Sequence, residues 1–125
     1  MAIGIGKCVP NLRVANVDAS LAFYVDRLGF TMDWDDAGVG FDERMYASIS
    51  RDDCQICLSA HAGDGSTGAS VWAYVKDVRA LHADLVERGA TPDHEPREEP
   101  WGETSFSLRD PDGNKICFTQ PAEKS

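Results

Sequence analysis

Residues 14–29 of this chain read Val-Ala-Asn-Val-Asp-Ala-Ser-Leu-Ala-Phe-Tyr-Val-Asp-Arg-Leu-Gly, and residues 75–89 read Val-Lys-Asp-Val-Arg-Ala-Leu-His-Ala-Asp-Leu-Val-Glu-Arg-Gly. The second stretch repeats the first loosely, at an offset of 61 positions that drops to 60 at the final glycine. The pairs that fix this register are Val14 with Val75, Val17 with Val78, Val25 with Val86, Arg27 with Arg88, and Gly29 with Gly89. Each stretch predicts a strand end followed by a helix that stops at glycine. The simplest account is one domain of two similar halves, with a ligand site expected where they meet.

The flanking sequence predicts the same order of elements in both halves. In the first half we expect a strand at 7–15, a helix that begins at Asn16 or Asp18 and ends at Gly29, and strands at 30–35, 44–50 and 54–59. In the second half we expect a strand at 70–75, a helix at 78–87, a weak strand around Thr91, and strands at 104–109 and 115–119. This predicts an α+β domain spanning 1–125, with βαβββ modules at about 5–61 and 69–121 and a curved mixed sheet around a cleft.

Length and charge limit the class of protein. The chain of 125 residues fits one domain that can bury a core without disulfides. Its net charge of −9 argues against a nucleic-acid partner, which requires a basic surface. The acidity suits either a cationic small molecule or solubility alone. No apolar run reaches the length of a membrane span or a signal peptide, so we expect a cytoplasmic protein without a membrane partner.

The closely spaced cysteines Cys54 and Cys57 invite a redox or zinc interpretation. A redox pair of this spacing normally opens a helix, whose N-terminus lowers the pKa of the thiol. Residues 53–59 instead have the pattern of a strand, on which positions three apart face opposite sides. With no second pair to complete a zinc site, we interpret both cysteines as structural.

Two segments carry a resemblance to a known family. Residues 20–30 read Ser-Leu-Ala-Phe-Tyr-Val-Asp-Arg-Leu-Gly-Phe, and residues 108–118 read Leu-Arg-Asp-Pro-Asp-Gly-Asn-Lys-Ile-Cys-Phe. Together with the βαβββ duplication, they resemble the vicinal oxygen chelate superfamily, which includes glyoxalase I, extradiol dioxygenases, fosfomycin resistance enzymes and bleomycin resistance proteins. The resemblance covers nearly the whole chain, and its most specific part is the terminal segment.

Enzymes of this superfamily hold a divalent metal through one His or Glu on each of four strands. The resemblance carries these positions onto Val9, Cys57, Ser70 and Cys117, none of which is His, Asp or Glu. Oxygen and imidazole ligands hold the metals that these enzymes use, and valine binds no metal. We therefore expect no metal or other cofactor and no catalytic residue, and we lean towards a protein that is not an enzyme.

Within the superfamily, the chain is most similar to the metal-free bleomycin resistance proteins. The shared features include Val9-Pro10, Trp72 with Tyr74, and Pro100-Trp-Gly102. The resemblance implies a homodimer that exchanges its N-terminal strand at Pro10, with two clefts at the interface. It also implies sequestration of a bleomycin-type glycopeptide or a similar planar cationic ligand, which confers resistance. The alternatives are a metal-dependent lyase, isomerase or dioxygenase of the superfamily, and a binding module for an unrelated metabolite.

Strand alternation indicates which side chains line the cleft. If the four former ligand positions face inward, Ser59, Trp72 and Tyr74 share that face, because positions two apart lie on one side. Aromatic rings there are either core or a platform for planar, cationic groups. An acidic run at 33–36 and 42–43 either steers a cation to the cleft or is a solvated loop. The resemblance also implies that Trp34, Tyr46, Trp72 and Trp101 fall at, or close to, aromatic positions of the family's cleft. Alternation and resemblance together give the expected ligand-binding residues Asp33, Trp34, Tyr46, Ser59, Trp72, Tyr74 and Trp101.

Overall fold

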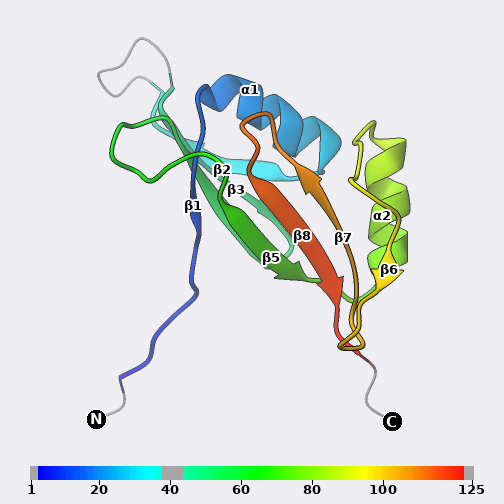
Figure 1. The fold of residues 1–125 in the computed structure, drawn as a ribbon. Coiled ribbons are helices and arrows are strands. Elements are labelled where there is room, and N and C mark those ends of the chain that lie inside the picture. The colour runs from blue at the N-terminus through cyan, green and yellow to red at the C-terminus, as the bar shows by residue number, and fades with distance from the viewer. Residues whose placement is uncertain (1–2, 38–43, 123–125) are drawn as a thin grey trace.

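The computed structural model describes residues 3–37 and 44–122, which form the two predicted βαβββ modules (Figure 1). The first half contains β1 (Asn11–Arg13), α1 (Val17–Leu21) with its π-helical continuation (Ala22–Arg27), β2 (Thr31–Asp35), β3 (Tyr46–Arg51) and β4 (Cys54–Ser59). The second contains β5 (Ser70–Tyr74), α2 (Val78–Glu87), β6 (Arg97–Glu98), β7 (Thr104–Arg109) and β8 (Lys115–Gln120).

The two halves share one sheet topology. Each forms a four-stranded mixed sheet, in the orders β1-β4-β3-β2 and β5-β8-β7-β6. The first strand of each half lies parallel to the last, as Leu12 with Leu58 and Ala73 with Phe118 show. The other neighbours run antiparallel. The α+β fold class and the duplication predicted from the sequence are therefore confirmed.

Matching caps and glycines bound the two helical segments. The side chain of Asn16 accepts a hydrogen bond from the Ala19 N–H at 2.9 Å, and that of Asp77 accepts one from the Ala80 N–H at 3.0 Å. Such caps satisfy backbone donors that have no partner inside a helix. Both segments end before a glycine with positive φ, +73° at Gly29 and +93° at Gly89, a conformation in which other residues are strained.

One hydrophobic core runs through both halves. Helix α1 packs against β4, while α2 packs against β7 and β8. The strand faces opposite the positions of Val9, Cys57, Ser70 and Cys117 are largely buried. They contribute Leu12, Val14, Ile56, Leu58, Ile116 and Phe118, with Val71 and Val75 partly buried.

Each half also anchors the other through polar contacts. Tyr24, a fully buried residue of the π-helical continuation of α1, donates its hydroxyl hydrogen to Asp110 Oδ2 at 2.9 Å in the β7–β8 turn. Burial, followed by the Asp110 carboxylate, raises the pKa of Tyr24 well above its usual range. The Arg51 guanidinium, in the β3–β4 turn, donates to Asp84 Oδ2 at 3.1 Å on α2. Each hairpin turn thus holds the helix of the opposite half.

Two strands differ from the sequence prediction. The first was expected over 7–15, but β1 spans only Asn11–Arg13 and residues 3–8 form an exposed extended arm that leaves the domain (Figure 1). The strand expected around Thr91 lies instead at Arg97–Glu98. Pro92, Pro96 and Pro100 lack the N–H that a ladder requires. The strand that pairs with β7 therefore lies in the short stretch between the last two, and before it the Asp93 N–H makes a separate hydrogen bond to the Ser107 carbonyl of β7 at 2.7 Å.

Among the residues that the structure describes, no helix is long and apolar enough to cross a membrane.

Candidate functional site

An aromatic pair stands on the sheet of the first half. The Trp34 and Tyr46 rings are stacked, with centroids 5.4 Å apart and planes at 22°. Trp34 remains 50% exposed, so one face of the pair is open. Stacked rings present a flat, electron-rich surface that attracts planar and cationic groups. Trp34 and Tyr46, two of the predicted ligand-binding residues, therefore form one flat aromatic surface, called the aromatic platform below.

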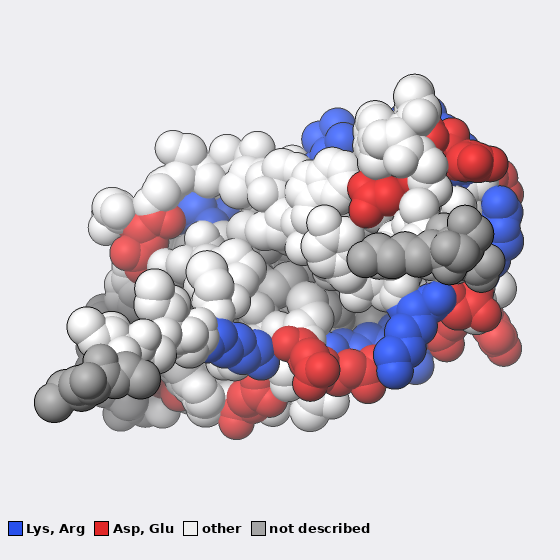
Figure 2. Space-filling model, turned by 90° about the horizontal axis from the view of Figure 1, so that it is seen from below, with Lys and Arg blue, Asp and Glu red and all other residues white. Residues whose placement is uncertain are grey.

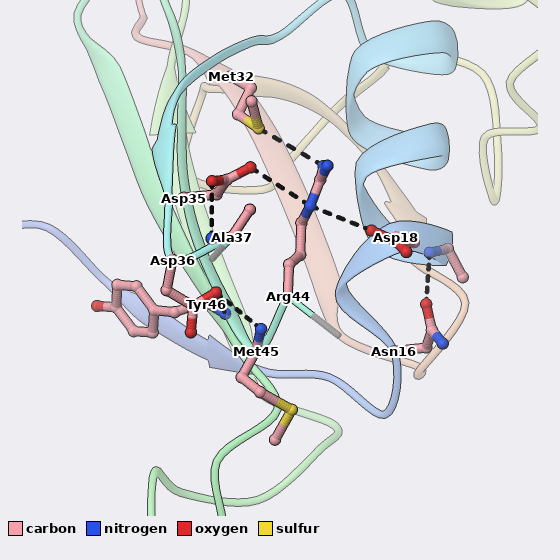
Figure 3. A network of polar contacts seen from close by, with 10 residues as sticks. Asn16, Asp18, Met32, Asp35, Asp36, Ala37, Arg44, Met45 and Tyr46 are labelled. Atoms are coloured by element: carbon pink, nitrogen blue, oxygen red, sulfur yellow. Dashed lines mark hydrogen bonds and ion pairs between the residues drawn. The ribbon is translucent and has the colours of Figure 1, made fainter. Parts of the chain in front are cut away.

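The neighbouring acidic residues hold this platform in place (Figure 3). Asp36 Oδ1 accepts hydrogen bonds from the backbone N–H groups of Met45 and Tyr46, at 2.8 and 3.0 Å. Asp35 forms an ion pair with Arg44 at 3.3 Å. The acidic run had two interpretations from the sequence, steering of a cation or a solvated loop, and these two of its carboxylates make contacts within the fold. Asp42 and Glu43 lie outside the described residues.

The pKa of Asp36 lies below its usual value. Desolvation by itself raises this pKa, but the N–H donors of Met45 and Tyr46 and the nearby His61 ring together lower it by more than desolvation raises it. The His61 Nε2 atom lies 3.7 Å from Asp36 Oδ2, and its ring lies 6.5 Å from that of Tyr46. Asp36 is therefore an anion at neutral pH, beside the aromatic platform.

A partly buried polar cluster adjoins the platform. Asp33 accepts hydrogen bonds from the Ser48 and Ser50 hydroxyls at 3.3 and 2.8 Å, and Gln55 donates to the Ser48 hydroxyl at 2.9 Å. Ser59 is fully buried and donates to Asp64 at 2.6 Å. The carboxylates of Asp33 and Asp64 are acceptors that attract a cation.

The prediction from sequence did not include Ser48, Ser50 or Asp64. The alternation of serines with Ala47 and Ile49 was the available signal for the first two. The position of Asp64 next to Ser59 depends on the path of the connecting loop, which has no periodic pattern.

The predicted aromatic residues of the second half lie open to solvent. Trp72 and Tyr74 point away from the core on β5 and are 55% and 71% exposed. Trp101, in the β6–β7 loop, donates its indole N–H to Glu103 at 2.7 Å. Among the described residues, the ring contacts of Trp34 and Tyr46 do not extend to these three. One chain thus presents two separate aromatic surfaces.

The four positions that hold metal in related enzymes carry Val9, Cys57, Ser70 and Cys117 in this chain. Cys57 and Cys117 are buried, Ser70 is exposed, and Val9 has no donor atom. A hydrogen bond with the Cys57 sulfur, followed by burial, raises the pKa of Tyr46 to about 12. Within 3–37 and 44–122, no three His, Cys, Asp or Glu side chains gather as metal ligands would. The residues at these positions do not fit such a metal.

A cavity of about 760 Å³ lies elsewhere, at the junction of the two halves. It opens between the β3–β4 turn and the end of β5, on the hollowed face in Figure 2, which carries acidic and basic side chains along its edge. Its apolar lining comes from core residues of both halves, including Phe30 and Phe118. The sequence offered no signal for this cavity, because the packing between the halves creates it.

Comparison with known proteins gives the family. Residues 4–118 match the model of the glyoxalase/bleomycin resistance protein/dioxygenase superfamily. Proteins named bleomycin resistance protein, from Geobacillus stearothermophilus and Staphylococcus aureus, are each 27% identical over 127 residues, covering 91% of this chain and 96% of their own.

Solved structures agree over almost the whole chain. A bleomycin-binding protein complexed with bleomycin superposes with a TM-score of 0.75 at 26% identity, covering 94% of this chain and 99% of its own. The bleomycin resistance determinant encoded on transposon Tn5 gives 0.76 at 26%, covering 96% and 100%. The bleomycin-binding protein of Streptomyces verticillus, complexed with copper(II)-bleomycin, gives 0.74 at 28%, covering 98% and 100%. With its duplicated βαβββ topology and the match over residues 4–118, this chain belongs to the glyoxalase/bleomycin resistance protein/dioxygenase superfamily.

Proposed function

We propose that this protein is a metal-free binding protein that sequesters a bleomycin-type glycopeptide, or a similar planar cationic molecule, and thereby confers resistance. The observation that carries the proposal is the pair of aromatic surfaces, Trp34 on Tyr46 in one half and Trp72 with Tyr74 in the other, all on sheet faces away from the core. Exposed rings on a rigid sheet stack on flat heteroaromatic groups. The similar proteins named for bleomycin resistance and bleomycin binding support this ligand class.

Electrostatics favours the same ligand class. The chain carries a net charge of −9, and the Asp33, Asp36 and Asp64 carboxylates lie beside the first aromatic surface. Carboxylates near an aromatic platform attract a cation and hold its flat part against the rings. Binding of this kind requires no chemical step.

The proposal includes a homodimer. Residues 3–8 form an extended exposed arm, and pairing with β4 starts where the Pro10 carbonyl accepts a hydrogen bond from the Cys57 N–H at 2.9 Å. Ile3 and Ile5 are 92% and 97% exposed, and an arm that displays such side chains is a ready partner for another chain. We propose that the arm crosses to a second copy at Pro10, so that one aromatic surface from each copy forms a cleft.

Titration with bleomycin, followed by tryptophan fluorescence, tests the ligand. We expect saturable quenching, and we expect Trp72→Ala to weaken binding by about 1–2 kcal/mol, roughly 5- to 30-fold in Kd, because a stacking surface is lost. Val86→Ala is the matched control, since Val86 is an exposed apolar residue on α2. Absence of binding at high micromolar bleomycin would overturn the proposal that bleomycin is the ligand, and it would favour a binding module for an unrelated metabolite. An activity that depends on a full equivalent of bound divalent metal would favour an enzyme instead.

A further inference from the structure

The two halves meet at two equivalent seams. At each, the first strand of one half ends beside the hairpin turn of the other, and the backbone positions correspond. The Val14 N–H donates to the Ser59 carbonyl and the Val75 N–H to the Thr119 carbonyl, both at 2.9 Å. Residues 13–16 with the turn 110–114 are called the closed seam here. Residues 74–77 with the turn 51–54 are called the open seam.

Side chains of the turn fill the closed seam. Asp112 Oδ1 accepts a hydrogen bond from the Ala15 N–H at 3.0 Å. The Asn114 side chain donates to the Arg13 carbonyl at 3.1 Å and accepts from the Ala69 N–H at 2.9 Å. A carboxylate and an amide therefore satisfy the outward-facing backbone groups at this end of β1.

At the open seam, no described side chain of the turn forms a hydrogen bond with residues 74–77. Its turn is one residue shorter. Arg51 and Cys54 pair across the two residues 52–53, whereas Asp110 and Asn114 pair across the three residues 111–113. Cys54 thus stands where the other half has Asn114. The cavity of about 760 Å³ lies at this seam (Figure 2).

The cavity suits a molecule with an apolar body. Its floor is made of core side chains, Leu28, Phe30, Leu81 and Phe118, with Ala73 and Val75 from β5. Burial raises the pKa of the Cys54 thiol in its wall, although Lys7 lowers it in part, so the thiol is neutral. The volume lies within the range of about 300–1,000 Å³ that is usual for ligand pockets.

The polar groups of the cavity indicate the head group. The Lys76 N–H corresponds in register to the Ala15 N–H, which binds a carboxylate at the closed seam. Lys76 and Arg51 also line the cavity. The Lys76 ammonium brings positive charge, whereas the Arg51 guanidinium is already paired with Asp84 and the Leu28 carbonyl. The acidic residues at the cavity are Asp52, Asp53 and Asp77; the first two are exposed at the turn, and Asp77 caps α2 through the Ala80 N–H.

We propose that the open seam, which borders the second aromatic surface at Tyr74 but does not include Trp72 or the Trp34–Tyr46 pair, is a second binding site for a small amphipathic carboxylate. Its apolar body lies on Leu28, Leu81 and Phe118, and its carboxylate takes the place at Lys76 that Asp112 takes at the closed seam. The site lies within one chain, and it does not depend on bleomycin binding.

The probe for this site is 2-naphthoate, titrated into the full-length protein and followed by amide chemical shifts. We expect saturable shifts centred on Cys54, Lys76 and Leu81, and affinity lowered about tenfold in Lys76→Ala because a charge-assisted contact is lost. Lys115→Ala is the matched control, since Lys115 lies on β8 outside the cavity lining. Ala73→Leu, which adds volume inside the cavity, should also weaken binding.

Three results would overturn the proposal. One is equal affinity for 2-naphthylmethylamine, which has the same ring and the opposite charge. Another is a set of shifts centred on Trp34 or Trp72, which would place the probe on the aromatic surfaces. The third is the absence of saturable shifts, as expected if the arm of a second copy fills the cavity. Trp72→Ala should leave naphthoate binding unchanged while it weakens bleomycin binding, so either proposal can fail without the other.

Discussion

Gly89 is the residue at which the close contact between the halves is clearest. It adopts a φ of +93°, and a Cβ added there would collide with the Arg27 guanidinium of the opposite half. Arg27 also donates to the Gly89 carbonyl at 2.6 Å. Gly63 has a similar φ of +96°, but a Cβ added there would meet nothing within 4 Å. The two glycines therefore separate the cost of backbone strain from the cost of close approach.

We expect Gly89→Ala to destabilise the protein by about 1–3 kcal/mol, since it combines strain at positive φ with displacement of Arg27. Gly63→Ala, which has the strain alone, should cost about 1 kcal/mol. The free energy of unfolding in urea measures both. Equal losses in the two variants would show that Arg27 yields without cost and that the contact between the halves contributes nothing.

Strand alternation predicted much of the candidate site at the level of single residues. It placed Trp72 and Tyr74 on the face opposite Val71 and Val75, where the structure has them exposed. Their role in binding stays a prediction. Alternation could not show that Asp36 would bind the backbone of Tyr46, or that Trp34 would stack on that ring. Such contacts arise from the pairing of β2 with β3, which brings distant positions together.

At the scale of elements, helix α2 and strands β4 and β7 lie at the residues where the periodic pattern predicted them. The first strand was predicted too long because its alternation continues beyond the residues that pair with β4. Pro10 has no N–H to donate, and in the register that sets Asn11 opposite Cys57, β4 begins at Cys54 and leaves Lys7 without a partner in that strand. The sixth strand was misplaced because three prolines leave room for only two paired residues, Arg97 and Glu98. The module boundaries of about 5–61 and 69–121 stay a prediction.

The β3–β4 turn and helix α2 are linked by an ion pair that should depend on pH. Desolvation raises the pKa of Asp84, but hydrogen bonds from Arg88 and Arg51 lower it below its usual value. A lowered folded-state pKa adds stability above the unfolded pKa near 3.8, and this stability is lost as pH falls through the folded-state pKa. Because the Asp84 side chain is 37% exposed, solvent screening limits the gain to about 1 kcal/mol.

We therefore expect Asp84→Asn to lower the free energy of unfolding by up to about 1 kcal/mol near pH 7 and by much less near pH 3. Urea unfolding at both pH values measures the difference. Asp26→Asn serves as the control, because no described ion pair involves Asp26. A loss that stays constant between the two pH values would contradict the electrostatic explanation.

At the scale of the whole molecule, the exposed arm makes the proposed dimer testable. We expect the full chain to sediment as a dimer at micromolar concentration, and a variant without residues 1–8 to sediment as a monomer, because the arm supplies the exchanged strand. Ile3→Ser with Ile5→Ser keeps the length of the arm and should weaken the dimer through loss of apolar contact. A monomeric full chain, or an unchanged dimer after truncation, would rule out exchange at Pro10.

The reciprocal contacts between the halves have a consequence for the history of the fold. Arg27 of the first half touches Gly89 of the second, and Arg88 of the second lies against Gly29 of the first. When residue i of one unit meets residue j of another and the reverse also holds, the interface has the signature of a two-fold symmetric pair. The junction inside this chain therefore has the form of a subunit interface. Such a form is expected if two copies of a single-module ancestor, already paired as separate chains, were joined by fusion of their genes.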